Sequence, residues 1–395
     1  MKYFFTKVGL ATIFLGGSFL IATVETKKVL TVGGVTCDFF LEMDGKGLDY
    51  ISLTDEGKRV SFIAFHEGNK VDLTGLHQYS GGGAGNAAVS FSKQGVETAV
   101  FCKVGNDSFG KSILEEFNNF GISTKHVLVD EKLTTASSFI ISSQSGERTI
   151  LVNRGANTNI KLESFASSVL EEVDGIYITA LSGKSAEILL PILQMAHEKN
   201  ILVALNPGVA QLKGGKNCIL NGLKFIDILI LNEVEAAVLA ETFCNCGFNL
   251  SNKQLENSNN KNIPEFLQKP IFAKGERMVS LTDFCSSLIA LGPKIVLVTN
   301  GSAGAYAFSE KAVFYHAILP VNVVNTIGAG DAFGSTFVGS FLSGKNIEQS
   351  MRFATINSAS VVGVEDAKSG LLSKKEIEER SLEIRRDFFS QFLIY

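Results

Sequence analysis

Residues 325–333 read Asn-Thr-Ile-Gly-Ala-Gly-Asp-Ala-Phe, a glycine-rich turn followed by an acidic residue. Gly328 and Gly330 have no Cβ atom, so consecutive backbone N–H groups can point toward one spot, as they do in anion-binding turns. Every fourth residue is then a phenylalanine up to residue 341, which predicts a helix that ends at Gly344. Because the N-terminus of a helix favours negative charge, the segment predicts a phosphate site at this turn.

Asp331 stands in the first turn of that predicted helix, beside the predicted phosphate site. A carboxylate next to a bound phosphate is electrostatically unfavourable, so its presence there indicates a role in the chemistry. The role that fits a carboxylate is to remove a proton from an alcohol. Aspartate is also a favoured N-cap residue, and the segment alone leaves that second interpretation open.

The composition is that of a globular protein with room for a large core. The chain has 395 residues and a formal net charge of −4, which allows one α/β domain with a small appendage, or two domains. The acidic balance and the lack of a long basic run argue against a nucleic-acid partner. The six cysteines are scattered and lack the spacing of a zinc site. They predict free thiols and a cytoplasmic protein.

Residues 1–28 form an apolar N-terminal extension with lysines on both sides. Its apolar run is short for a membrane span, and no clear cleavage site of a signal peptide follows it. Three interpretations stay open: a signal or anchor, membrane contact through residues 1–26, and a dispensable extension. The extension is left out of the fold prediction.

After residue 174, short apolar runs alternate with helical segments, which predicts a parallel sheet with crossover helices. The runs cover residues 175–179, 201–205, 225–231 and 295–299. Each of the last three ends in a polar or glycine-containing turn. Since ligands of open α/β sheets bind at the carboxyl ends of the strands, we expect these turns to meet at one edge.

Other segments have different patterns. Residues 29–80 and 126–154 read as strands and turns, and they predict a small β-sheet lid over the site. Residues 245–263, rich in Asn, Ser and Lys, predict a mobile surface insertion. Residues 373–395 begin with the spacing of a capping box and carry one apolar face, which predicts a C-terminal helix.

Taken in order, these motifs resemble the ribokinase-like (PfkB) family of carbohydrate and nucleoside kinases. The C-terminal signature of that family, Asp-Thr-x-Gly-Ala-Gly-Asp, is present except at its first position, Asn325. The resemblance covers residues 29–372. It implies an α/β, ribokinase-like fold, with a Rossmann-like, mostly parallel central sheet flanked by helices and a small β-sheet lid.

Residues 81–86 read Gly-Gly-Gly-Ala-Gly-Asn. Neither the glycine spacing nor a following acidic residue matches a dinucleotide-binding fingerprint, which argues against a Rossmann dehydrogenase. The resemblance implies instead that Gly82 and Asn86 contact the phosphoryl acceptor. It also implies that Asp38 accepts hydrogen bonds from substrate hydroxyls and that Asn157 lies near the substrate.

Asn232 and Glu235 match the family's Asn-x-x-Glu motif, which implies that they organise magnesium and its waters around the nucleotide phosphates. The same spacing is that of a helix capping box, which is the alternative. The resemblance further implies that Thr299 and Gly301 contact ATP and that Asn357 lies on the adenine side.

The implied reaction is a direct in-line transfer of the γ-phosphoryl group of ATP to an alcohol. Asp331 would be the general base, and Gly328, Ala329 and Gly330 would stabilise the charge of the phosphoryl group at the helix N-terminus. Many relatives have an aspartate at the position of Asn325 that helps to form a monovalent-cation site. The need for such a cation therefore stays open.

The acceptor stays open between a sugar and a nucleoside. A nucleoside would need aromatic side chains around its base, for which Phe39, Phe40 and Phe65 are candidates. The alternative to a kinase is a non-catalytic sugar- or nucleotide-binding protein of the same fold, and retention of Asp331 and Glu235 argues against it. Relatives form dimers through their lids, which allows a homodimer here.

Overall fold

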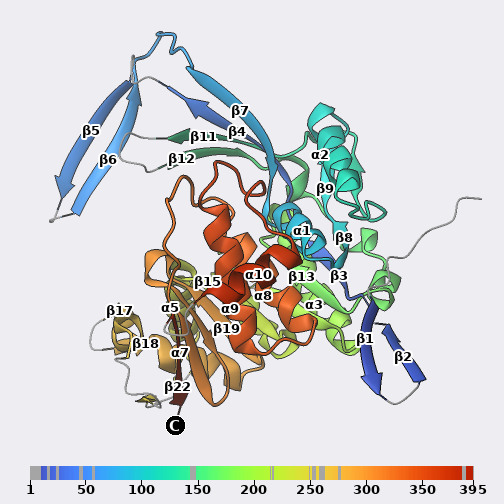
Figure 1. Ribbon diagram of the computed structural model, residues 1–395. Helices are drawn as coiled ribbons and strands as arrows, with labels where there is room; N and C mark the ends of the chain where they lie inside the picture. Colours follow the sequence, from blue (N-terminus) through green and yellow to red (C-terminus); the bar gives the residue numbers. More distant parts are fainter. Residues whose placement is uncertain are drawn as a thin grey trace, which may run out of the picture.

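A ten-stranded mixed sheet forms the centre of the computed structural model (Figure 1). The structure describes residues 10–15, 18–23, 26–43, 48–55, 58–142, 148–213, 215, 218–248, 250, 255–257, 263–274, 277–384 and 388–394. Six neighbouring strands run parallel, in the order β8 (Glu97–Phe101), β3 (Lys28–Val32), β13 (Gly175–Ile178), β14 (Leu202–Leu205), β15 (Ile228–Asn232) and β19 (Ile295–Thr299). Four antiparallel strands complete it: β20 (Ala305–Phe308), β21 (Ala312–His316), β22 (Phe389–Ile394) and β16 (Leu255–Asn257).

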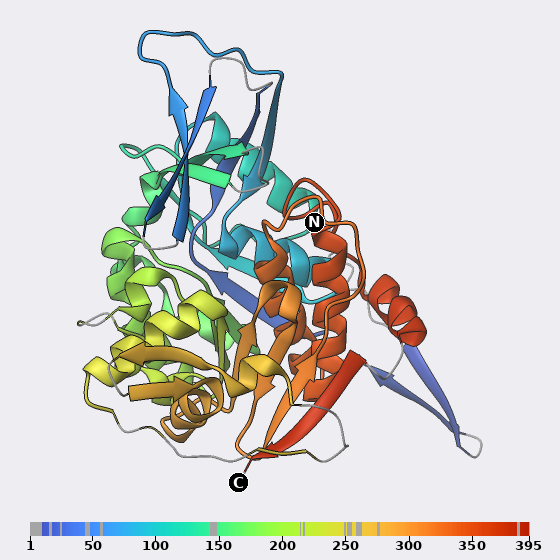
Figure 2. The same ribbon diagram turned by 90° about the vertical axis from the view of Figure 1, so that its left-hand side faces the viewer.

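Helices cover both faces of this sheet, which explains why the parallel strands are apolar at nearly every position. One face packs against α1 (Gly83–Lys93), α8 (Ala329–Leu342) and α9 (Ile347–Val361). The other face packs against α3 (Leu189–Glu198), α5 (Glu233–Asn245) and α7 (Leu281–Ala290). Figure 2 shows these two helical layers on either side of the sheet. The prediction of a mostly parallel sheet flanked by helices is confirmed.

A separate four-stranded sheet forms the lid. Its order is β12 (Arg148–Asn153), β11 (Ser137–Ser142), β4 (Thr36–Glu42) and β7 (Gly75–Gly81). The hairpin of β5 (Leu48–Asp55) and β6 (Lys58–Phe65) is an additional two-stranded sheet, and Figure 1 shows it hanging from the lid. The predicted lid began at residue 29, but β3 pairs with β8 and β13 in the central sheet. The lid therefore begins at β4.

The remaining elements are short or peripheral. They are α2 (Ser108–Asn119), α4 (Val209–Leu212), α6 (Glu265–Gln268), α10 (Lys374–Glu383), and the strand pairs β1 (Leu10–Leu15) with β2 (Ser18–Thr23), β9 (Lys103–Gly105) with β10 (Leu128–Asp130) and β17 (Pro270–Lys274) with β18 (Arg277–Ser280). Within the part of the chain that the structure describes, no helix has both the length and the apolar character needed to cross a membrane.

The C-terminal segment differs from its prediction. The helix α10 has the predicted capping box at Ser373 and Glu376, but it ends at Glu383, and β22 follows as a strand of the central sheet. The prediction of one helix to residue 395 was wrong in this second part. Ser390 and Phe392 are buried while their neighbours are only partly so, which is the alternation of a strand. β22 also pairs with β16, so the predicted insertion contributes a strand, although most of residues 249–262 lie outside the described residues.

Candidate active site

The glycine-rich turn at residues 325–330 starts helix α8, as predicted. Gly328 is the N-cap residue and has a φ of 80°, a conformation that favours glycine. A Cβ atom there would overlap the side chain of Ala367, whereas one on Gly330 would meet nothing within 4 Å. Gly328 is thus required by the backbone, while Gly330 borders open space at the helix N-terminus. The turn leaves room there for an anion.

Asp331 lies in the first turn of α8 and is held by a residue that is distant in sequence. Asn86 Nδ2, on α1, donates a hydrogen bond of 2.8 Å to Asp331 Oδ2. Burial raises the pKa of Asp331, the hydrogen bond from Asn86 lowers it, and the charge of Asp38 raises it. The carboxylate therefore has a partner that orients it and an environment that makes it a stronger base than an exposed aspartate.

Asp38 lies on β4 at the base of the lid. Ser138 Oγ on the neighbouring strand donates a hydrogen bond of 2.6 Å to Asp38 Oδ1. Gly81 on the neighbouring strand β7, which pairs with Thr36, leaves room for this carboxylate, because a Cβ atom there would overlap Asp38 Oδ2. Burial raises the pKa of Asp38, and hydrogen bonds from Ser138 and Thr36 oppose that shift. The predicted substrate-binding aspartate is thus a partly buried acceptor near Asp331.

Gly82 and Asn157 shape the backbone beside these carboxylates. Gly82 has a φ of 86°, and a Cβ atom on it would lie 2.5 Å from the carbonyl oxygen of Gly34. Asn157 accepts a hydrogen bond of 3.3 Å from Val35 N and donates one of 2.8 Å to Val35 O. Both residues therefore fix the turn between β3 and β4, and the amide of Asn157 is already occupied by backbone.

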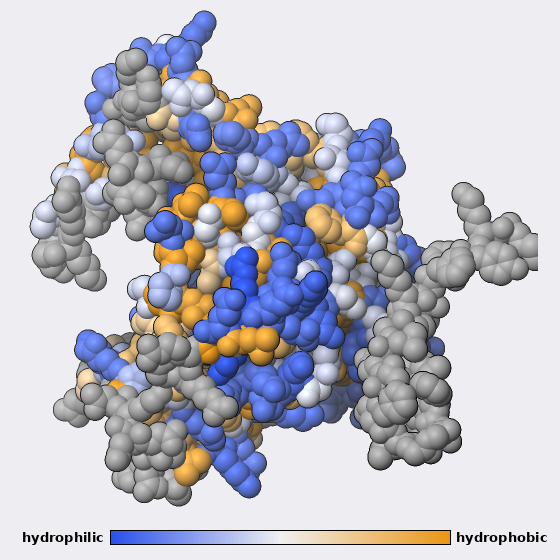
Figure 3. Space-filling view, viewed as in Figure 1, coloured by the Kyte–Doolittle hydropathy of each residue, from blue (hydrophilic) through white to orange (hydrophobic). Residues whose placement is uncertain are grey.

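An apolar cavity of about 490 Å³ adjoins the turn at α8. Its lining includes the predicted nucleotide residues Thr299 and Gly301 together with Ala329 and Gly330. Figure 3 shows apolar surface below the lid. The segment after β21 exposes Ile318, Val321, Val323 and Val324. The register of the sheet places Thr299 beside Asn232, so the turns of β15 and β19 do meet at one edge.

Asn357 does not line this cavity, and its predicted place on the adenine side stays a prediction. Its side chain is fully buried, and Nδ2 donates to Thr336 Oγ1 at 2.7 Å while Oδ1 accepts from Leu372 N at 2.8 Å. Four other residues at the end of α9 line the cavity: Thr355, Ser358, Ala359 and Val362. Their spacing of i, i+3, i+4 and i+7 is the helical signal that could have identified this face.

Asn232 and Glu235 form the capping box of α5. Asn232 Oδ1 accepts from Glu235 N at 2.8 Å, and Glu235 Oε2 accepts from Asn232 N at 2.9 Å. Burial raises the pKa of Glu235, and the charge of Asp331 raises it further. One carboxylate oxygen of Glu235 is left for a ligand. In the part of the chain that the structure describes, no group of three His, Cys, Asp or Glu residues is arranged to hold a metal ion.

Asn325 keeps the turn in place despite its departure from the signature. Its Oδ1 accepts a hydrogen bond of 2.8 Å from Ile327 N, as a carboxylate oxygen could. Its Nδ2 donates to the carbonyl oxygen of Glu365, which a carboxylate could not do. The amide therefore joins the turn before α8 to the segment after α9.

The sequence reasoning missed a residue of the lid. Arg148, the first residue of β12, donates from Nη1 to Thr326 Oγ1 at 3.1 Å. Thr326 belongs to the turn before α8 and lines the apolar cavity. The lid thus touches the predicted phosphate site directly. An arginine near a turn has no distinctive sequence pattern, so only the tertiary structure could identify it.

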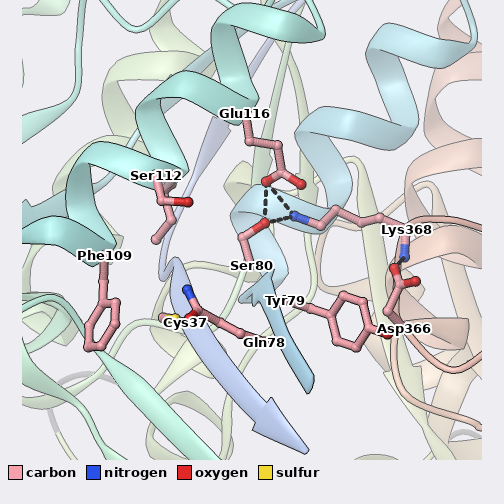
Figure 4. Close-up of a pocket in the computed structure, with 10 residues that line it drawn as sticks. Cys37, Gln78, Tyr79, Ser80, Phe109, Ser112, Glu116, Asp366 and Lys368 are labelled. Carbon is pink, nitrogen blue, oxygen red and sulfur yellow. Dashed lines mark hydrogen bonds and ion pairs between the residues drawn. The ribbon is translucent and has the colours of Figure 1, made fainter. Parts of the chain in front are cut away.

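A second cavity, of about 220 Å³, lies behind the lid between β7, α2 and the segment after α9 (Figure 4). Lys368 Nζ is 2.6 Å from Glu116 Oε2, and Ser80 Oγ is hydrogen-bonded to both groups. Only 6% of the Lys368 side chain is exposed. Burial lowers the pKa of Lys368, and Glu116 opposes that shift. None of these residues was predicted to have a role.

The fold and the site define a class of protein: a ribokinase-like α/β enzyme with a lid and a glycine-rich anion turn. The chain matches the pfkB family of carbohydrate kinases over residues 54–374 and belongs to that family. It is therefore a carbohydrate kinase.

Individual relatives are similar at low identity. The chain is 24% identical to the ribokinase of Staphylococcus aureus over 325 residues, which cover 82% of this chain and 88% of that one. Two solved structures share its fold. The ribokinase of Thermotoga maritima has a TM-score of 0.67 at 21% identity, and the ribokinase of Arabidopsis thaliana, complexed with ribose and ATP, has a TM-score of 0.67 at 19% identity. In each case 91% of this chain and 100% of the other are covered.

Proposed function

We propose that this kinase transfers the γ-phosphoryl group of ATP to a hydroxymethyl group of a small sugar, with Asp331 as the general base. The observation that carries the proposal is the position of Asp331. Its carboxylate lies in the first turn of α8, is held by Asn86 at 2.8 Å, and adjoins the open space at Gly330. A base and an anion site within one helical turn are what phosphoryl transfer to an alcohol requires.

In this mechanism the acceptor hydroxyl gives its proton to the Asp331 carboxylate as its oxygen attacks the γ-phosphorus. A new bond between that oxygen and phosphorus forms, the bond from phosphorus to the β–γ bridging oxygen breaks, and ADP leaves. Backbone N–H groups of Ala329 and Gly330 stabilise the charge on the phosphoryl oxygens. Asn86 holds the carboxylate in orientation, and Asp38 binds other hydroxyl groups of the acceptor.

The nucleotide is proposed to lie in the apolar cavity, with its base against the segment after β21 and its phosphates toward Gly330. Thr299 and Gly301 line that path. Magnesium, when bound, would supply positive charge that reduces the charge of the phosphates. Glu235 fits as its protein ligand or as a ligand of its waters, because one oxygen is free and magnesium usually keeps several waters. Asn232 would act only by fixing Glu235 through the capping box.

The lid favours a sugar over a nucleoside as acceptor. The aromatic residues considered for a nucleobase do not face one another, because neighbouring residues of a strand point to opposite faces. Phe39 packs on Phe109 and Phe139, with centroid distances of 5.5 and 5.2 Å, and Phe40 packs on Tyr79 at 5.6 Å. Phe65 lies on the separate hairpin of β5 and β6. These three do not form a sandwich, and the polar groups near Asp331 suit hydroxyls.

A non-catalytic binding protein was considered because of Asn325. Asn325 gives little reason to prefer a binding protein, because its amide keeps the hydrogen bond that orders the turn. Membership of the carbohydrate kinase family favours the enzyme.

A homodimer through the lid is a further part of the proposal. The edge strand β12 exposes three consecutive apolar side chains, Ile150, Leu151 and Val152, each about half exposed. Such a surface is unfavourable in water unless another surface covers it. Light scattering at several protein concentrations should show a dimer, and the variant Leu151→Lys should be a monomer. A wild-type protein that is a monomer at all concentrations would exclude the homodimer.

The test of the function is ADP release by the full chain with Mg-ATP and a panel of ribose, fructose, their phosphates and nucleosides. We expect release that depends on one sugar and that Asp331→Asn abolishes. The matched control is Asp72→Asn, at an exposed position of the segment before β7, which should leave the rate unchanged. Release with a nucleoside alone would overturn the choice of acceptor, and release unaffected by Asp331→Asn would overturn the assigned base.

A further inference from the structure

The second cavity, behind the lid, takes no part in the proposed reaction. Cys37 on β4 and Ser80 on β7 both line it, and they pair with each other across the two strands. Asp38, the proposed acceptor-binding residue, is the next residue along β4. Because neighbouring residues of a strand point to opposite faces of the sheet, Asp38 and the second cavity lie on opposite sides of the lid. A ligand in this cavity would therefore leave the acceptor site free.

Two carboxylates and one ammonium line the cavity, so a ligand of either charge would meet a group of like sign. Lys368 Nζ lies 2.6 Å from Glu116 Oε2. Asp366 Oδ1 accepts hydrogen bonds from the backbone N–H groups of Lys368 and Ser369, at 2.7 and 2.8 Å. An anion would be repelled by Glu116 and Asp366, and a cation by Lys368. The lining therefore favours a neutral ligand.

The same groups offer hydrogen bonds to a neutral ligand. An ammonium has three donors, and Lys368 uses two of them on Glu116 and Ser80. In the part of the chain that the structure describes, the hydrogen bonds to Glu116 use Oε2, which leaves Oε1 as an acceptor. Gln78 on β7 and Ser112 on α2 add an amide and a hydroxyl to the lining (Figure 4). The cavity thus has donors and acceptors for several hydroxyl groups.

The size of the cavity limits the ligand to a small molecule. Its volume is about 220 Å³, and a water molecule takes up about 30 Å³ in the liquid, so it has room for about seven waters or for one small polyol. Pockets for drug-sized ligands usually begin at about 300 Å³, which argues against a nucleotide here. Phe109 and Ile113 supply apolar lining for the carbon chain of a polyol.

The segment after α9 connects this cavity to the glycine-rich turn before α8. Lys368 of this segment lines the cavity. The residue before it, Ala367, packs against Gly328, because a Cβ atom on that glycine would overlap Ala367. The carbonyl oxygen of Glu365 accepts the hydrogen bond from Asn325. A ligand bonded to Lys368 therefore acts on a segment that supports the proposed phosphate site.

We propose that the second cavity binds a small neutral polyol as an effector, and that the segment after α9 couples this binding to that of the nucleotide. The coupling rests on the proposed function, since it assumes that the nucleotide phosphates bind at the glycine-rich turn, whereas the binding of the polyol does not. A bound polyol holds Lys368 and with it the segment that packs on Gly328. We expect the polyol to tighten nucleotide binding about fivefold, the low end of allosteric coupling.

The first experiment compares three probes with the same six-carbon chain: sorbitol is neutral, gluconate is an anion and glucamine is a cation. Calorimetry with the full chain, without nucleotide, should show that sorbitol binds about tenfold more tightly than the other two, because each charged end group meets a like charge. Absence of sorbitol binding would overturn the site. Equal or tighter binding of gluconate or glucamine would overturn the assignment of a neutral ligand.

Substitutions in the lining locate the binding. Ser112 is an exposed residue of α2 that lines the cavity, so Ser112→Trp should fold, fill the cavity and weaken sorbitol binding about tenfold or more. Gln78→Leu removes one hydrogen-bonding amide and should weaken it about fivefold. The matched control is Asn118→Trp, at an exposed position of the same helix outside the cavity, which should bind sorbitol like the wild type. Sorbitol binding that both lining variants leave unchanged would contradict the proposal.

The coupling is measured with MgADP, which cannot phosphorylate a probe. Saturating sorbitol should tighten MgADP binding about fivefold, and by linkage saturating MgADP should tighten sorbitol binding by the same factor. An affinity for MgADP that sorbitol does not change would overturn the coupling. A protein that binds sorbitol but no MgADP would refute the proposed nucleotide site and leave the polyol site standing.

Discussion

Two clusters of partly or fully buried charge flank the base of the lid, and they are built in opposite ways. The acid cluster, Asp331 with Asn86 and Asp38, contains two carboxylates and one amide. Burial raises the pKa of both acids. The ion-pair cluster, Lys368 with Glu116 and Ser80, places an ammonium 2.6 Å from a carboxylate. The acid cluster therefore holds negative charge without a paired cation, whereas the ion-pair cluster balances its negative charge with an ammonium. Uncompensated charge favours the proposal that the acid cluster does the chemistry, since perturbed acids gather at functional sites.

The two clusters also act on each other. The positive charge of Lys368 lowers the pKa of Asp38, against the stronger effect of burial. Asp38 in turn raises the pKa of Asp331. The ion pair therefore supports the lid mechanically, through β7 and α2, and it adjusts the acid cluster only indirectly. The following variants test whether chemistry and stability are divided between the clusters in this way.

The largest effect is expected for Asp331→Asn. Loss of a general base typically costs about 10²–10⁴-fold in rate, and we expect the upper part of that range for kcat. The same change should raise the melting temperature at neutral pH, because a carboxylate with a raised pKa costs stability when it is ionised. This gain should shrink as the pH falls through the raised pKa toward the ordinary value for aspartate. Calorimetry across pH measures it, and a destabilised variant would contradict our assignment of uncompensated charge to this cluster.

Glu116→Leu should show the reverse: a large loss of stability with kcat nearly unchanged. Breaking a buried ion pair typically costs about 3–5 kcal/mol, and because 27% of the Glu116 side chain is exposed we expect the lower end. The double variant with Lys368→Met should recover part of the loss, since no unpaired charge remains. Urea unfolding gives these values. Glu172→Gln, in the exposed pair with Lys125, is the control and should change little.

Asn86→Ala should shift the pH dependence of the reaction. The base must be ionised, so kcat/KM falls as the pH drops through the raised pKa of Asp331, and this acid limb lies above the ordinary range for aspartate. Asn86 lowers that pKa through its hydrogen bond, so its removal moves the limb to still higher pH. At neutral pH we expect kcat/KM to fall about tenfold to a hundredfold, the usual worth of a hydrogen bond to a charged group. An unmoved acid limb would show that Asn86 does not act on the base.

The smallest effect concerns Asn325. Its amide donates to the carbonyl oxygen of Glu365, a contact that needs no bound cation. We therefore expect wild-type activity to be the same in potassium and in a large organic cation. Asn325→Asp turns the donor into an acceptor facing a carbonyl oxygen, which should lower activity about tenfold in the organic cation, and potassium should restore it. Potassium activation of the wild type would contradict this prediction.

Patterns within single elements were predictable from the sequence. The apolar runs at residues 175–179 and 295–299 became β13 and β19, and the turn before Phe333 became the N-terminus of α8. Such features depend on side-chain period and on glycine at one backbone position, both of which are local. The surroundings of Asn357 and of the aromatic residues of β4 could not be predicted, because the face of a helix or strand on which a side chain lies depends on what packs against it.

Thus the sequence by itself determined the class of fold, the glycine-rich turn before α8 and the place of Asp331 in the first turn of that helix, because periodicity and glycine geometry act over a few residues. Only the tertiary structure decided which groups meet at Asp331. Asn86 and Asp331 are 245 residues apart, Arg148 and Thr326 are 178 apart, and Lys368 and Glu116 are 252 apart. The contact between Arg148 and Thr326 joins the lid to the central domain, and the other two join elements that are far apart in the sequence. Their partners are fixed by how two sheets and their helices pack, which no local pattern records.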